Sequence, residues 1–368
     1  QLTDSVGIIR NVYGREVVTL GAGQYMLTVQ DSDTLPHAYK FRVLTRDVAT
    51  AITPGTPVNG TLSPDGTAQL YRFNGIQGQR VNIDGLSSDS SISWQLTDAY
   101  GRSVSSGNTY YNYDISLPTS GEYLLSVYHD FRNDSATQRN FSFNLIPETT
   151  TLGTFVLDAD IAGSISQPNE RVIYNFTLTA PTTVLVDTWT GDTNISGYLA
   201  WSLTGPRGSE ASEHGFTEDT YDENVFALPA GDYTFTVLGW QLRTGAFNFR
   251  LTDLSAAPTL ALDTTTHVSL IPGDRSRVQR FTLTQSTDLI FDRITTNNGN
   301  SGWSIYNASG KRRIYGYLNS DSSKFTLAAG EYYLAINGYD PTLTEFDFGL
   351  RIPTTKTAAI ALDTVVNG

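Results

Sequence analysis

The sequence predicts an all-β protein built of tandem antiparallel β-sandwich domains with a jelly-roll-like arrangement. Aromatic and β-branched residues alternate with polar ones at a period of two, in short runs bounded by Gly, Asn, Asp, Ser and Pro. The spacing typical of helices is nearly absent, and one set of landmarks recurs four times along the chain. Because the polar positions leave one face of each sheet wet, two sheets must pack face to face to bury their apolar sides.

The clearest landmark is a Leu followed by small residues, a Gly, any residue, a Tyr and alternating apolar positions. It occurs at 20–29, 117–127, 228–237 and 327–336, and its glycines are Gly23, Gly121, Gly231 and Gly330, at intervals of 98, 110 and 99 residues. A Gly directly before a strand predicts a turn at positive φ. The Tyr two residues later predicts a corner residue, with its ring in the core and its hydroxyl hydrogen-bonded.

Other landmarks keep the same order in each repeat. An aromatic alternation follows each Gly-x-Tyr strand, at 39–43, 141–145, 247–251 and 346–350, and predicts a core strand. Upstream, Trp94, Trp201 and Trp303 each open a Trp-x-apolar-x-polar-x-x-Gly pattern, so we expect these tryptophans in the core. A pair of strands opens each repeat, at 60–62 with 71–73, 163–165 with 174–176, and 268–270 with 279–281.

These landmarks predict five segments. Repeat 1 (1–50) is the C-terminal half of a β-sandwich, repeats 2 (51–150), 3 (151–255) and 4 (256–353) are complete sandwiches, and 354–368 is the opening strand of a further repeat. The chain then begins and ends inside a domain, which would expose sheet edges. We expect an excerpt of a longer covalent array, with strand exchange between neighbouring copies as the alternative.

Composition and charge exclude several classes of function. With 24 basic and 37 acidic residues, the formal net charge of −13 has the wrong sign for binding nucleic acid or an anionic membrane. The absence of Cys excludes disulfides, thiolate nucleophiles and Cys-ligated metals. No run of eighteen apolar residues occurs, so no membrane insertion is expected. Little Met and Lys with abundant Thr, Ser, Asn, Gly and Tyr predicts an extracellular or cell-surface location of the kind found in bacterial proteins.

The sequence also lacks the patterns of an enzyme. The four histidines, His37, His129, His214 and His267, fall at different points of the repeat, and no HExxH, GxSxG or phosphate-loop spacing is present. We therefore predict no catalytic residues and no cofactor other than a candidate Ca²⁺.

The candidate Ca²⁺ site is the loop after the Gly-x-Tyr strand of repeat 2, where Asp130, Asn133 and Asp134 would supply oxygen ligands. Acidic residues stand at similar places in repeats 1 and 4, but repeat 3 has 239–241 (Gly-Trp-Gln) there. The alternative interpretation is a set of solvated turns, which the missing third copy favours.

Trp189 and Trp240 are the candidate ligand-binding residues, because they lie outside the recurring Trp position. Exposed aromatic rings beside polar groups suit a carbohydrate, whereas the alternative is that these rings cover a domain junction. The acidic segment 210–223 occurs only in repeat 3 and is interpreted as a solvent-exposed loop.

The repeat resembles the bacterial pre-peptidase C-terminal domain family. The resemblance lies in Gln69-Leu70-Tyr71-Arg72-Phe73, in Leu96-Thr97-Asp98-Ala99-Tyr100-Gly101 and in the closing Ala230-Gly231-Asp232-Tyr233 to Val237, and it covers the three complete repeats and the partial one. It implies a jelly-roll-like sandwich of secreted proteases or, in tandem, of large surface proteins. No protease domain accompanies it in this chain.

The expected function is that of a non-catalytic structural repeat region of a bacterial extracellular protein: a stalk, filament or adhesin scaffold. Linkers at 147–150 and 256–258 would give a semi-rigid rod whose partners are neighbouring repeats or copies joined head to tail. The alternatives are a carbohydrate- or cell-surface-binding module and the accessory domains of a secreted hydrolase.

Overall fold

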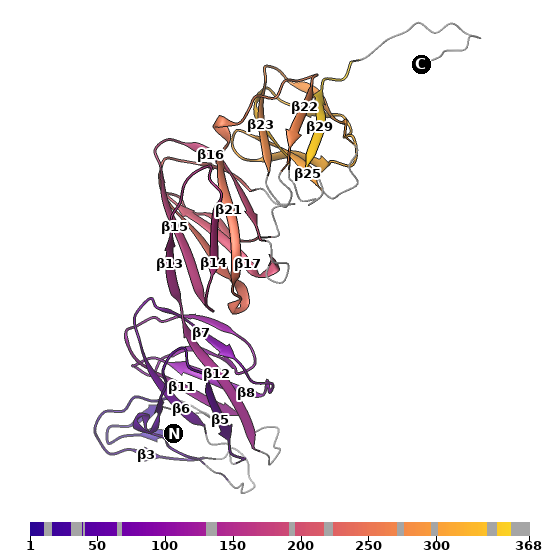
Figure 1. Ribbon diagram of the computed structural model, residues 1–368. Coiled ribbons are helices and arrows are strands. Elements are labelled where there is room, and N and C mark those ends of the chain that lie inside the picture. The colour runs from indigo at the N-terminus through magenta and orange to yellow at the C-terminus, as the bar shows by residue number, and fades with distance from the viewer. Residues whose placement is uncertain are drawn as a thin grey trace, which may run out of the picture. The chain divides into compact units, whose positions relative to one another are not determined.

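A computed structural model describes residues 1–10, 17–30, 39, 41–64, 68–129, 138–190, 196–216, 224–270, 276–295, 301–336 and 344–354. The chain is all-β, as predicted, and it divides into two compact units, 1–149 and 150–368 (Figure 1). None of the segments in these ranges forms a helix long and apolar enough to cross a membrane.

Repeat 2 is a jelly roll, in which one long antiparallel hairpin is rolled into two sheets. Its eight strands in chain order are β5 (Val58–Leu62), β6 (Gln69–Gly75), β7 (Arg80–Gly85), β8 (Ile92–Thr97), β9 (Ser103–Asn108), β10 (Tyr113–Ser116), β11 (Gly121–His129) and β12 (Arg139–Pro147). First pairs with last, second with seventh, third with sixth and fourth with fifth. The two layers of the sandwich are the sheets β10-β7-β12-β5 and β6-β11-β8-β9, and the short strand β4 (Thr50–Ala51) adds to the second sheet beside β6.

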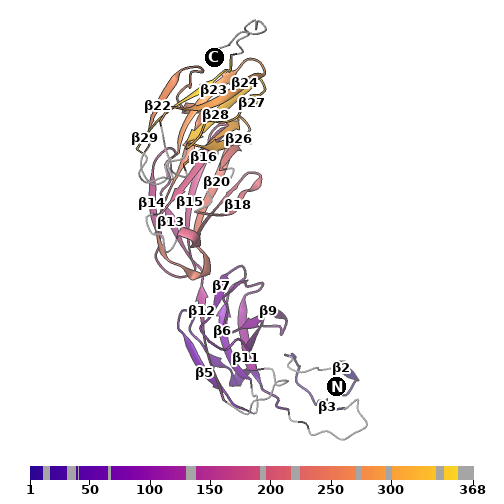
Figure 2. The same cartoon turned by 90° about the vertical axis from the view of Figure 1, so that its right-hand side faces the viewer.

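The corresponding strands of repeats 3 and 4 pair in the same two orders, and β13 (Thr149–Gly153) adds to one sheet of repeat 3 beside β15. Figures 1 and 2 show the ribbons of these repeats from two sides. In repeat 3 they are β14 (Ile161–Ile165), β15 (Glu170–Leu178), β16 (Thr182–Trp189), β17 (Leu199–Gly205), β18 (Gly208–Gly215), β19 (Val225–Leu228), β20 (Gly231–Gly239) and β21 (Gly245–Asp253). In repeat 4 they are β22 (Thr265–Ser269), β23 (Arg277–Leu283), β24 (Thr287–Arg293), β25 (Gly302–Asn307), β26 (Arg312–Tyr317), β27 (Phe325–Leu327), β28 (Gly330–Ile336) and β29 (Glu345–Arg351).

Each of these repeats has its own apolar core between its two sheets. The three recurring tryptophans, Trp94, Trp201 and Trp303, are buried, as predicted. The aromatic pairs of the last strand are buried beside them, with Phe249 stacked on Phe235 at 4.4 Å between ring centroids. The period-two pattern therefore marks the inward face correctly.

The predicted tyrosine corner is present in all four repeats. The hydroxyls of Tyr25, Tyr123, Tyr233 and Tyr332 each donate to the carbonyl oxygen four residues upstream, at 2.6 to 3.0 Å. The preceding Gly121, Gly231 and Gly330 have positive φ, as expected for the turn, whereas Gly23 of repeat 1 does not. In the complete repeats the Gly therefore turns the chain into the seventh strand, and the Tyr hydroxyl has a hydrogen-bond partner at the edge of the core.

The described part of repeat 1 forms a small sheet. Its described strands are β1 (Leu2–Thr3), β2 (Ile8–Arg10) and β3 (Met26–Leu27), in the order β2-β1-β3. Tyr39, Phe41 and Val43, whose counterparts are core residues in the other repeats, are 61 to 74% exposed and lie outside any strand. No described strand of repeat 1 pairs with them, and an isolated strand has no stability of its own.

Candidate functional sites

The candidate Ca²⁺ ligands, Asp130, Asn133 and Asp134, lie outside the described residues, so this site stays a prediction. Within the ranges given above, no three His, Asp or Glu side chains gather closely enough to hold a metal ion.

Trp240 begins a short 3-10 turn, η5 (Trp240–Leu242), directly after β20. Gln241 and Leu242 both have positive φ, 52° and 62°, which is uncommon for residues with a Cβ. Gly239 makes the turn possible, because a Cβ there would lie 1.9 Å from the carbonyl oxygen of Arg243. The half-buried Trp240 ring is held by its Nε1, which donates to the carboxylate of Glu213 at 3.1 Å.

A second aromatic group at this turn is Tyr198, over whose ring the Arg243 guanidinium lies at 4.7 Å. Tyr198 closes the 3-10 turn η3 (Ser196–Tyr198). The two rings and the two charged groups are thus engaged within repeat 3 itself.

The acidic loop of repeat 3 is not simply a solvated excursion. Residues 208–215 form the edge strand β18, which pairs with β17 and carries both Glu210 and Glu213. Glu210 receives a bidentate contact from Arg207, and Glu213 holds Trp240. Residues 217–223 lie outside the described part of the chain.

Trp189 is placed on the opposite sheet from Trp240. It is the last residue of β16, half-buried, and lies opposite Asn248 of β21. The two candidate tryptophans therefore belong to different layers of the sandwich, and a ligand-binding role for either stays a prediction.

The junction between repeats 3 and 4 is a built contact within the second compact unit. After β21 the chain turns in η6 (Leu254–Ala256), and the amide of Leu260 then donates to the carbonyl oxygen of Arg280 at 2.7 Å. A buried apolar cluster joins Leu185, Val225 and Leu254 of repeat 3 to Tyr306, Tyr333 and Ala335 of repeat 4. The residues at 256–258, predicted as a linker, are therefore part of a packed turn.

Gly310 closes the same junction. It has a φ of 80°, and a Cβ on it would lie 2.6 Å from the carbonyl oxygen of Val225. Beside it the hydroxyl of Thr183 donates to the carbonyl oxygen of Ala308 at 3.2 Å. The turn between β25 and β26 thus rests directly on the backbone of β19.

Repeats 1 and 2 meet in the same way within the first compact unit. The 3-10 turn η1 (Arg46–Val48) corresponds to η6, and β4 (Thr50–Ala51) then runs parallel to β6. Gly101, the counterpart of Gly310, has a φ of 77° and faces Thr19, whose hydroxyl donates to the carbonyl oxygen of Tyr100. The contact geometry recurs although the chain segments are about 200 residues apart, counting from Gly101 to Gly310.

The chemistry of the two junctions is different. Where repeat 3 has Leu254, repeat 1 has Arg46, which donates to the carbonyl oxygens of Asp98, Ala99 and Glu122 and lies 3.6 Å from the Glu122 carboxylate. At this position one junction thus has a buried apolar side chain and the other a side chain that donates hydrogen bonds. A pattern search misses this equivalence, since Leu and Arg share no property at this position.

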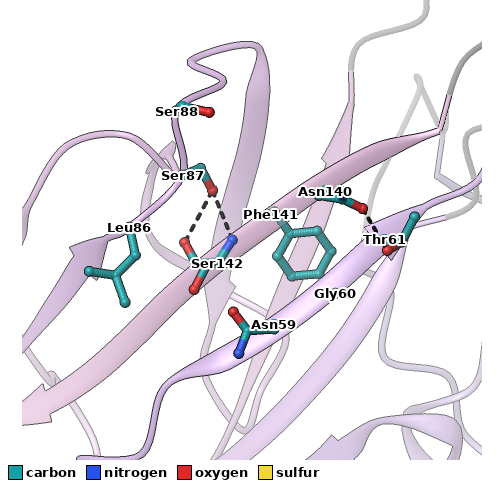
Figure 3. A pocket seen from close by; sticks show the side chains of 9 residues that line it. All are labelled: Asn59, Gly60, Thr61, Leu86, Ser87, Ser88, Asn140, Phe141 and Ser142. Atoms are coloured by element: carbon teal, nitrogen blue, oxygen red, sulfur yellow. Dashed lines mark hydrogen bonds between the residues drawn. The ribbon is translucent and has the colours of Figure 1, made fainter.

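A hollow of about 480 Å³ lies on the outer face of the four-stranded sheet of repeat 2 (Figure 3). Its sides are the outward side chains of β5 and β12 and the loop after β7. The lining residues are Asn59, Gly60, Thr61, Leu86, Ser87, Ser88, Asn140, Phe141 and Ser142. None of them was predicted as a site residue from the sequence, because Asn and Ser on the solvent-exposed face of a sheet have no distinguishing pattern.

The Ser87 hydroxyl fixes this loop to the sheet. It accepts the backbone amide of Ser142 at 2.9 Å and lies 3.1 Å from the Ser142 carbonyl oxygen, to which it donates (Figure 3). Across the hollow, Thr61 donates to the side-chain oxygen of Asn140 at 2.8 Å. The hollow is therefore lined by ordered, uncharged polar groups and one exposed aliphatic residue, Leu86.

No protein-family model matches the chain, and neither does any curated protein. Among solved structures, the pre-peptidase C-terminal domain of a collagenase from Bacillus anthracis is 23% identical, with a TM-score of 0.24, over 26% of this chain and 93% of that one. The CUB1-EGF-CUB2 domains of rat MASP-1 are 8% identical, with a TM-score of 0.17, over 55% of this chain and 100% of that one. The strand order, rather than these likenesses, establishes the fold.

Proposed function

We propose that this chain is a non-catalytic structural repeat region of an extracellular or cell-surface protein, in which sandwich modules act as spacers. The observation that supports this role is the junction found twice, between repeats 1 and 2 and between repeats 3 and 4. The two junctions have the same backbone arrangement although one has Arg46 where the other has Leu254. Such an arrangement would hold neighbouring modules at a set orientation.

The physical basis is the loss of freedom at each junction. A free linker of a few residues lets two domains rotate, whereas a 3-10 turn followed by parallel pairing leaves few backbone torsions unconstrained. In repeats 3 and 4 the buried cluster around Leu254 adds apolar burial to these backbone bonds. The net charge of −13 opposes lateral association of such modules.

The test is a distance distribution between two spin labels in the intact chain. The chain has no Cys, so Thr179→Cys in repeat 3 and Ser286→Cys in repeat 4, both exposed, would be the two labelled positions. We expect one narrow distance by double electron–electron resonance. Leu254→Asp places an unpaired charge in the junction and should broaden it, whereas Val156→Asp, at an exposed position of repeat 3, should not.

A broad distribution in the otherwise unchanged chain would contradict the spacer role. So would a Leu254→Asp variant that keeps the narrow distance while near-UV circular dichroism shows both repeats folded.

A further inference from the structure

The edge strand β26 of repeat 4 begins with a concentration of positive charge. Among the 24 basic residues of the sequence, Lys311, Arg312 and Arg313 are the only ones that are adjacent to each other. Residues 293–320, which include β25 and β26, contain no Asp or Glu, although the chain has a net charge of −13. Two tyrosines follow in the same strand. We call Lys311, Arg312, Arg313, Tyr315 and Tyr317 the basic strip.

The pairing of β26 with β25 turns both tyrosines of the basic strip outward. β26 is the last strand in the order β23-β28-β25-β26 and is labelled in Figure 2. Gly316 lies opposite the core residue Trp303, and a Cβ on it would lie 2.8 Å from the Trp303 ring. Because successive residues of a strand point to opposite faces, the neighbouring Tyr315 and Tyr317 point away from the core. Their side chains are 59% and 43% exposed.

A β-bulge positions the basic residues beside these rings. Tyr306 of β25 lies opposite Arg312 and Ile305 lies opposite Ile314, so Arg313 is the extra residue of the bulge. The Arg312 guanidinium lies over the Tyr315 ring, 4.8 Å from its centroid, and so holds that ring in place. Lys311 and Arg313 are exposed, and no described residue forms an ion pair with either side chain.

The corresponding edge strands show that the sandwich itself does not need these residues. In repeat 2 the core residue Trp94 lies opposite Gly107 of β9, a strand without any charged or aromatic residue. In repeat 3 the counterpart β18 carries Glu210 and Glu213. Charges protect an edge strand from aggregation, but exposed aromatic rings do not. The combination of basic and aromatic side chains in repeat 4 therefore indicates a contact surface.

The chemistry of the strip selects an anionic ligand with flat apolar faces. A guanidinium group binds a carboxylate through two parallel hydrogen bonds. A Tyr ring packs on an apolar face, and its hydroxyl remains free to form hydrogen bonds. Two residues of one strand that point to the same face lie roughly 7 Å apart, so both rings can contact one extended chain. A polysaccharide of uronic acids supplies carboxylates, hydroxyls and apolar ring faces together.

A nucleic acid is the competing polyanion, and the charge of the chain argues against it. Double-stranded DNA carries one negative charge per about 1.7 Å, and proteins that bind it commonly neutralise about 6–10 phosphates. The basic strip has three basic residues in a chain whose net charge of −13 repels a dense polyanion. A uronic acid polymer has at most one carboxylate per sugar ring, so this repulsion is weaker.

We propose that the basic strip of repeat 4 binds a carboxylated polysaccharide, with Lys311 and Arg313 on its carboxylates and Tyr315 and Tyr317 against its sugar rings. The site lies on one repeat and does not depend on the spacer role. It would give the array of sandwich modules a point of attachment to an acidic glycan.

The experiment is isothermal titration calorimetry of the intact chain with two carboxylated probes, hexagalacturonate and hexamannuronate. Cellohexaose is the neutral control, and a 12-nucleotide oligothymidylate represents nucleic acid. We expect at least one uronate to bind, and to bind more tightly than the other two probes. Its affinity should fall about tenfold or more between 50 mM and 500 mM NaCl, because salt screens the exposed charges.

Substitutions then test the residues of the strip. Tyr315→Ala and Arg313→Gln should each weaken uronate binding about tenfold, whereas Tyr315→Phe keeps the ring and should lose less. Tyr100→Ala is the matched control for the ring, since Tyr100 is 66% exposed and has the Arg102 guanidinium 5.1 Å from its centroid. Arg243→Gln, at an exposed position of repeat 3, is the control for the charge. Both controls should leave the affinity unchanged.

Four results would overturn the proposal. They are the absence of binding by both uronates, an affinity unchanged in Tyr315→Ala and Arg313→Gln, equally tight binding of cellohexaose, and tighter binding of the oligothymidylate, which would assign the strip to nucleic acid instead. Near-UV circular dichroism of each variant distinguishes a lost contact from a lost fold. Because the substituted side chains are exposed, we expect every variant to fold.

Discussion

Gly310→Ala tests the junction between repeats 3 and 4 through two separable effects. Its φ of 80° places an added Cβ in the left-handed region, which costs roughly 1–2 kcal/mol. The Cβ would also lie 2.6 Å from the Val225 carbonyl oxygen and 3.3 Å from the Ala227 amide nitrogen, which are backbone atoms without rotamers to escape. Overpacking of this kind adds about 1–3 kcal/mol. The expected loss of stability is therefore roughly 2–5 kcal/mol, by adding these two ranges.

Gly208→Ala is the matched control. Gly208 has the same place in repeat 3 and a φ of 93°, but its Cβ would meet nothing within 4 Å. This variant should lose only the roughly 1–2 kcal/mol of stability that a Cβ in the left-handed region costs. The gain from a stiffer unfolded chain is common to both variants and cancels in their difference.

Hydrogen exchange followed by mass spectrometry can resolve this difference, because it reports local opening in a chain of several domains that does not unfold in two states. In Gly310→Ala, amides at 225–228 and 259–260 should exchange faster than in Gly208→Ala, by a margin of about 1–3 kcal/mol in opening free energy. Equal exchange at these amides in the two variants would refute the packing of Gly310 against β19.

Two further predictions concern repeat 3. Tyr233→Phe removes the corner hydrogen bond to Pro229 and should lower the stability of repeat 3 by about 1–3 kcal/mol in urea unfolding. Tyr315→Phe changes an exposed ring of repeat 4 and should change the stability of that repeat little. Burial alone would raise the pKa of Glu170, but donors from Ser166, Thr151 and Gln167 outweigh it and hold that pKa below its ordinary value of 4.5. The ionised carboxylate therefore stabilises the fold fully above about pH 4.5, and this stabilisation is lost as the pH falls through the lowered pKa. Glu170→Gln should make the free energy of unfolding depend less on pH in the acid range. An unchanged pH dependence would contradict this reasoning.

Much of the fold was predictable because it depends on short-range pattern. The tyrosine corner needs only a Gly, a Tyr two residues later and a carbonyl four residues before that Tyr, so all four copies could be found in the sequence. The inward positions follow from the pleat, which places alternate residues on one face. Trp94, Trp201 and Trp303 were assigned to the core on this basis.

Pattern alone does not report strand partners. Tyr39, Phe41 and Val43 of repeat 1 have the alternation of a core strand but are exposed, because strand formation depends on the segments with which a strand pairs. The acidic segment 210–223 was predicted as a loop, yet its residues 210–215 belong to the edge strand β18, where one side of the backbone faces solvent and charges are tolerated.

The sequence by itself determined the all-β class and the residues of the sandwich cores, since these follow from periodicity and from the repeat. The tertiary structure alone decided the module junctions, which are made of residues far apart in the chain. Their equivalence is one of position rather than of residue type, since Arg46 and Leu254 occupy one place in the junction. Only strand register, which depends on which chain segments pair, brings such residues into correspondence.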